Sequence, residues 1–162
     1  MKKIFNILLQ DWYKTFHVLF ACLWTGAVAA VVLIFWMTDG NDSQAIILHS
    51  SLLIDRIDKF IIIPSSVLCY VFGLILSWKS NWGFFKFKWL VFKLIVGTSL
   101  LLFGVFFLGP WVMASDAILE QGDWNTYQIV QAKLGVSMTI QLVIILLVII
   151  VSTTKPWGRM NY

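Results

Sequence analysis

The chain has 162 residues, of which 60% are hydrophobic and 12% are charged, and its mean hydropathy is +0.86. A soluble domain is about half apolar and about one quarter charged, so this composition excludes a water-soluble globular fold. The net charge of +4 is typical of basic loops on one side of a membrane and does not indicate nucleic acid. The lipid bilayer is therefore the first partner that the sequence predicts.

Four apolar runs are long enough to cross the hydrocarbon core, which takes roughly 20 residues. They cover about residues 13–37, 60–78, 89–113 and 134–154. The first run is too long for a signal peptide, so we expect an uncleaved span. The fold class is therefore predicted as an all-α membrane protein, with one domain over 1–162 folded as a four-transmembrane-helix bundle.

The segment between the first two runs is amphipathic. It either lies on the membrane surface or extends the second helix outward, and Pro64 is placed to kink that helix. Asp55 and Lys59 are four residues apart, which on a helix makes a self-neutralising charge cluster. This cluster is either a helix cap and interfacial anchor or an external gate or anion contact.

Charges alternate along the chain in a way that predicts orientation. Acidic residues gather in the first and third loops, and basic residues flank the two ends and fill the second loop. By the positive-inside rule both termini are cytoplasmic. We expect a multi-pass protein of the bacterial inner membrane. The residues behind this prediction are Lys2, Lys3, Lys14, Lys79, Lys86, Lys88, Lys155 and Arg159 on one side and Asp39, Asp42, Asp116, Glu120 and Asp123 on the other.

Small and polar residues repeat at helical spacing in three spans, which predicts the faces that pack together. Gln141, midway along the fourth span, is expected to hydrogen-bond another helix, and Cys22 and Cys69 are expected to be small core residues. The predicted stripes are Cys22, Gly26 and Ala30; Ser66, Tyr70, Gly73 and Ser77; and Lys93, Gly97 and Gly104.

Two titratable residues stand inside the spans at matching depth. His17 lies four residues into the first span, and Lys93 lies four residues past Trp89 in the third. Both enter from the cytoplasmic side, about 6 Å in at 1.5 Å per residue. Because a charge inside a span is costly unless paired or hydrated, we predict a cytoplasm-facing pocket with His17 and Lys93 as candidate catalytic residues. In the structural alternative Lys93 reaches the interface and His17 only hydrogen-bonds a neighbour.

Aromatic residues and the second histidine bear on what such a pocket would hold. Trp24 falls on the same helical face as His17, and Trp24 and Trp89 are predicted as apolar walls. His49 lies on the outer side, so depth excludes a haem held by both histidines. A haem or porphyrin would have His17 as its metal ligand and either a non-histidine second ligand or none.

Three stretches of the chain carry a resemblance to known families: KTFHVLFACLWTGA, LLIDRIDKFIIIPSSVLCYVFGLILSW and KWLVFKLIVG. They resemble a family of small integral membrane proteins of unknown function and, more distantly, the HemJ-type protoporphyrinogen oxidases and the CopD-type copper-resistance membrane domain. The most specific residues are His17, Trp24, Gly26, Asp58, Pro64, Lys93 and Leu94.

The HemJ-type resemblance implies a helical bundle that holds haem or a porphyrin near the first-span histidine. It implies His17 as ligand or proton acceptor and Lys93 as the partner of a propionate or a proton. The resemblance to the uncharacterised family implies a fold and no activity.

Two functions therefore stand as hypotheses. The first is a membrane protein that binds haem or a porphyrin-like redox ligand at His17 and Lys93 and performs proton-coupled electron transfer. The alternative is a non-enzymatic membrane subunit or a small-solute or ion pathway, favoured by a polar stripe from Ser77 through Tyr70 and Ser66 to Asp58. A scaffold is a third reading. Each is compatible with a homo-oligomer or a membrane partner subunit.

Overall fold

The computed structural model describes residues 2–38, 42–79 and 87–157, with side chains from Gln10 onward except those of Asp116 and Glu120. Every element in these ranges is helical. Two short π-helical segments, η1 (Asp58–Ile62) and η2 (Gly104–Leu108), join α2 to α3 and α4 to α5 without a break. The α-helices are α1 (Lys2–Met37), α2 (Gln44–Ile57), α3 (Ile63–Lys79), α4 (Lys88–Phe103), α5 (Gly109–Glu120) and α6 (Trp124–Thr154).

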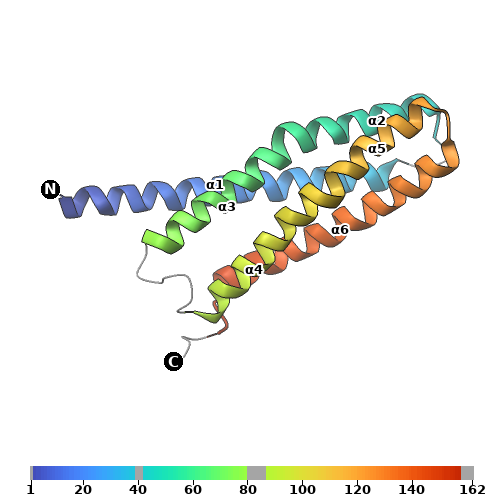
Figure 1. Cartoon of the computed structure of the whole chain (residues 1–162). Helices are drawn as coiled ribbons and strands as arrows, with labels where there is room; N and C mark the ends of the chain where they lie inside the picture. The colour runs from blue at the N-terminus through green and yellow to red at the C-terminus, as the bar shows by residue number, and fades with distance from the viewer. Residues whose placement is uncertain (1, 39–41, 80–86, 158–162) are drawn as a thin grey trace.

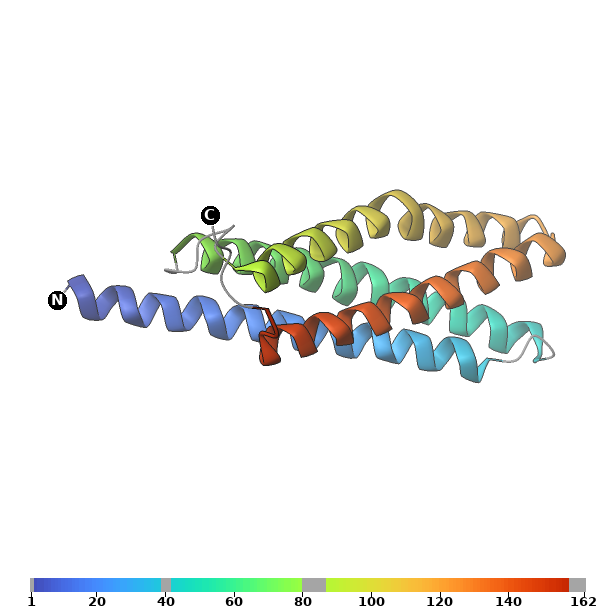
Figure 2. The same cartoon turned by 90° about the horizontal axis from the view of Figure 1, so that it is seen from below.

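These elements form four long rods that lie side by side (Figures 1 and 2). Each rod contains one predicted span and is long and apolar enough to cross a membrane, which confirms the all-α, four-transmembrane-helix bundle. The start of α1 and the end of α6 lie at the same end of the bundle. Asp39, Lys86 and Arg159, which carry part of the predicted charge asymmetry, lie outside the described residues.

The second rod is continuous from Gln44 to Lys79, so the amphipathic segment extends the second helix outward, one of the two predicted arrangements. Pro64 does not simply kink it. A proline has no N–H and its ring crowds the carbonyl four residues earlier, which here is that of Phe60 inside η1. A wider π turn accommodates both the missing N–H and the bulk of the ring. The same arrangement recurs in the third rod, where Pro110 follows η2 and the crowded carbonyl is that of Phe106.

The buried face of α1 differs from the one predicted. Cys22 and Gly26 are exposed, and no heavy atom lies within 4 Å of the position that a Cβ would take at Gly26. The prediction of a small-residue packing face through Cys22, Gly26 and Ala30 was therefore wrong. The α-helix instead buries a ridge of larger apolar residues, because its neighbours α3 and α6 lie on that side. The ridge consists of Ala27, Val28, Val31 and Val32.

A knob-and-hole contact joins α1 to α6 at the end of the bundle opposite the termini. The ring of Phe35 lies over Gly135 so closely that an added Cβ would overlap the ring atoms of Phe35. One residue along, Trp36 Nε1 donates a hydrogen bond of 3.0 Å to Thr139 Oγ1. Only glycine therefore allows α1 and α6 to approach this closely.

We expect Gly135→Ala to lower the free energy of unfolding by about 1–3 kcal/mol, the usual cost of overpacking a filled site. The matched control is Gly26→Ala, where the new methyl group meets nothing within 4 Å. That change should be neutral or stabilising by up to about 1 kcal/mol, since alanine favours helix over glycine. Equilibrium unfolding of the purified protein in mixed detergent micelles measures both, and equal stability of the two variants would contradict the described contact.

Candidate functional site

His17 is held by α3. Its Nδ1 lies 2.8 Å from the backbone carbonyl oxygen of Cys69, and the Cys69 Sγ is 3.7 Å from the same nitrogen. The ring also packs on Gly73, where an added Cβ would stand 3.0 Å from Cε1. The imidazole therefore sits in a notch that Gly73 leaves open, with α1 and α3 in close contact around it.

The Cys69 contact fixes which ring nitrogen carries the proton. A carbonyl oxygen can only accept, so Nδ1 donates to it, and in a neutral imidazole Nε2 keeps its lone pair. Metal-ligating histidines are commonly oriented in this way. In the described part of the chain, however, no group of three or more His, Cys, Asp or Glu side chains is placed to hold a metal ion. His17 could therefore serve as one ligand and not as part of a protein cage.

Lys93 reaches toward one end of its helix. Its Nζ lies 6.0 Å from the ring centroid of Trp89, and the Lys155 Nζ lies 5.6 Å from the same ring. Among the described residues, no hydrogen bond joins the Lys93 and His17 side chains. Trp89 is buried beneath both lysines. The predicted common pocket of His17 and Lys93 thus stays a prediction.

The polar stripe of α3 lies inside the bundle, as its spacing predicted. Ser66 and Ser77 are buried, and Gly97 of α4 packs on Tyr70. Toward the end that bears the termini these groups bond within the protein. The Tyr70 hydroxyl is 2.6 Å from Thr98 Oγ1, and Ser77 Oγ donates to the Gly73 carbonyl at 2.9 Å. This half of the stripe is therefore internally satisfied.

The other half opens into a cavity of about 350 Å³ between α1, α3, the η2 region and α6. Its walls are mostly apolar, and both π segments contribute to them. Trp24 is among the lining residues, whereas His17 is not. The polar residues on its walls are Asp58, Ser66 and Gln141.

Three of the groups around this cavity lack a partner in the described protein. The Nε1 of Trp24 is buried without a hydrogen bond. Neither Asp58 nor Gln141 makes a side-chain hydrogen bond or ion pair with a described residue. Two of the three residues are almost fully buried, since Gln141 is 6% exposed and Trp24 is 9% exposed. The expectation that Gln141 bonds to another helix was therefore wrong. An unmet buried polar group costs about 1–3 kcal/mol, so the buried Trp24 and Gln141 beside the half-buried Asp58 indicate a ligand site.

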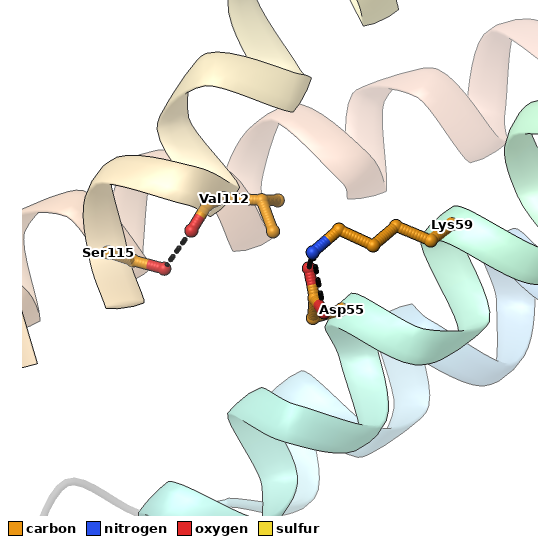
Figure 3. A network of polar contacts seen from close by, with 4 residues as sticks. All are labelled: Asp55, Lys59, Val112 and Ser115. Atoms are coloured by element: carbon orange, nitrogen blue, oxygen red, sulfur yellow. Dashed lines mark hydrogen bonds and ion pairs between the residues drawn. The ribbon is translucent and has the colours of Figure 1, made fainter. Parts of the chain in front are cut away.

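A neighbouring ion pair explains why Asp58 is left over. Lys59 Nζ lies 2.7 Å from Asp55 Oδ1, which confirms the predicted charge cluster (Figure 3). The Asp55 side chain is 13% exposed and points toward α5 (Figure 3). The nearby hydroxyl of Ser115 donates to the Val112 carbonyl of its own helix. The Lys59 ammonium is thereby directed to Asp55, and Asp58 faces the cavity instead.

Comparison with known proteins adds no assignment: no family model, no curated protein and no solved structure matches the chain. The candidate sites therefore rest on geometry alone. Sequence reasoning placed Ser66 and Asp58 on one polar stripe but did not bring Gln141 and Trp24 to them. The signal that could have done so is Pro110, which shares with Pro64 the ability to open a helix beside a polar residue.

We expect Gly73→Ala to push the His17 ring out of its notch, weaken its bond to Cys69 and lower the free energy of unfolding by about 1–3 kcal/mol. In a His17→Ala background the same change should cost much less, because the ring that it displaces is gone. The matched control is Gly97→Ala, where the new Cβ would make an ordinary contact of 3.6 Å with Tyr70. A double-mutant cycle in detergent measures the coupling, and strict additivity of Gly73→Ala and His17→Ala would refute the notch.

Proposed function

We propose that this chain is a non-enzymatic, multi-pass protein of the bacterial inner membrane, with both termini in the cytoplasm, that binds a small solute in the cavity at Asp58. The observation that carries the proposal is the set of three polar groups without protein partners, those of Asp58, Gln141 and Trp24, around one mainly apolar cavity. Binding sites of small molecules typically combine apolar walls with a few polar groups that fix orientation.

The chemistry of the three groups limits the solute. The Asp58 carboxylate and the Gln141 carbonyl accept hydrogen bonds, while the Gln141 amide and the Trp24 indole donate them. A group that both donates and accepts, such as a hydroxyl, would satisfy them together. The bonded pairs Tyr70–Thr98 and Ser77–Gly73 between this cavity and the other end of the bundle favour a binding cavity over an open pathway through the membrane.

We expect the Trp24 resonance in fluorine NMR of fluorotryptophan-labelled protein in lipid nanodiscs to shift saturably when n-hexanol or ethylene glycol is added. Trp24→Phe assigns the resonance. Gln141→Leu should weaken the apparent affinity about tenfold, which corresponds to about 1.4 kcal/mol, one good hydrogen bond. Gln128→Leu, on the exposed face of the same helix, is the matched control. A Trp24 resonance that moves with neither probe, or only in proportion to concentration, would overturn the proposal.

A second candidate function is binding of haem or a porphyrin at His17, as the HemJ-type resemblance implies. The observation that favours it is the bond from His17 Nδ1 to the Cys69 carbonyl, which leaves Nε2 with a lone pair for an iron. His17 would be the ligand, and Lys93 near Trp89 would offer a positive charge to a propionate. When bound, the haem would supply one-electron redox chemistry.

If this second function holds, protein purified in detergent and supplied with haem will have a Soret band that shifts on reduction with dithionite. His17→Ala should remove the band, because it removes the only histidine on this side of the bundle. His49→Ala, a change at an exposed position of α2, should retain it. A wild-type protein that stays colourless after haem is added back would exclude haem, and loss of the band in His49→Ala alone would exclude His17 as its ligand.

A further inference from the structure

The cavity at Asp58 has a floor and a mouth that come from different helices. The residues contributed by α1 and α6 are all buried, Trp24, Val28, Met138 and Gln141. Exposed residues come only from α3 and from the η2 and α5 region. A half-exposed apolar side chain in a membrane-spanning helix faces lipid. The large apolar residues exposed on the rim are Ile63 (48%), Val67 (47%), Val105 (67%) and Met113 (68%).

Within the ranges that the structure describes, the two rims pack mainly on other helices and only sparsely on each other. α3 packs mainly on α1, and α5 packs mainly on α6, whereas α3 and α4 meet over a short stretch around Tyr70 and Gly97. On the third rod the wall includes Gly104, and no heavy atom lies within 4 Å of the position that a Cβ would take there. The mouth is therefore a lateral opening that leads from the cavity into the surrounding acyl chains.

We propose that the occupant of this cavity is a membrane-dissolved amphiphile with a neutral, hydroxyl-bearing head that enters sideways from the lipid. This inference rests on the proposed function and adds the class of ligand and its route. The head would donate to Asp58 or Gln141 and accept from Gln141 or Trp24, while an apolar chain leaves between α3 and η2. A cationic head would satisfy Asp58 and leave both donors unmet, so the mixed set of groups favours a hydroxyl.

The test is photolabelling of the full chain in lipid vesicles with a fatty alcohol that carries a diazirine on its tail, followed by peptide mapping. We expect labelling of α3 and η2 that n-decanol competes away. Gly104→Phe should reduce it about tenfold, since the new ring would fill the mouth. Gly26→Phe is the matched control, because that position is equally uncrowded but lies on the lipid-facing side of α1, away from the cavity.

Two further reagents separate the possible failures. A diazirine alkane without the hydroxyl should label the lipid-facing surface without competition by n-decanol. A water-soluble diazirine polyol should leave the cavity unlabelled. If the polyol labels the cavity competitively and the fatty alcohol does not, lateral entry is overturned while solute binding stands. If no reagent labels the cavity competitively, both proposals fail, and equal labelling of Gly104→Phe and Gly26→Phe overturns the assigned mouth.

Discussion

The missing amide hydrogens of Pro64 and Pro110 are the constraint on which the cavity depends. Each proline leaves a carbonyl four residues earlier without its usual donor, and the helix widens to a π turn at that point. A π turn inserts one residue into the helical repeat, which rotates all later side chains by about 100°. In both rods the turn lies beside the same cavity, so two local backbone adjustments combine to separate α3 from α5 and to bring Asp58 to the gap.

A bilayer core offers no water, and the hydroxyl groups of this bundle follow that rule. Thr25, Thr98 and Ser77 each donate to the carbonyl four residues earlier in their own helix. His17 does the same across a helix pair, by donating to Cys69. Most polar side chains of the described helices are hydrogen-bonded close to their own position, so the unbonded groups of Asp58, Gln141 and Trp24 are unusual. Because the three lie around one cavity, they differ from an isolated polar residue in a core.

Much of the architecture could be predicted because it depends on length, hydropathy and spacing, as in the four rods and the Asp55–Lys59 pair. The choice of buried face could not. The second half of α1 is apolar on every side, so its sequence does not distinguish a lipid-facing surface from a packed one, and small residues such as Gly26 suit both. The prediction for Gln141 was wrong for a related reason. The cavity beside it depends on π turns in other helices, and these cannot be read from the sequence of α6.

In this bundle α1 packs on both α3 and α6, whereas α3 and α4 meet only over a short stretch, so the seam between α3 and α4 is its most weakly packed side. Widening that seam breaks first the short contact around Tyr70, while α1 and α6 stay joined through Phe35 and Gly135. The width of the opening therefore depends on the lateral pressure and the thickness of the surrounding bilayer. A membrane-spanning helix responds to a change in bilayer thickness by tilting. The aperture of this protein is therefore a property shared between the chain and its lipid, and it should differ between membranes even where the sequence is the same.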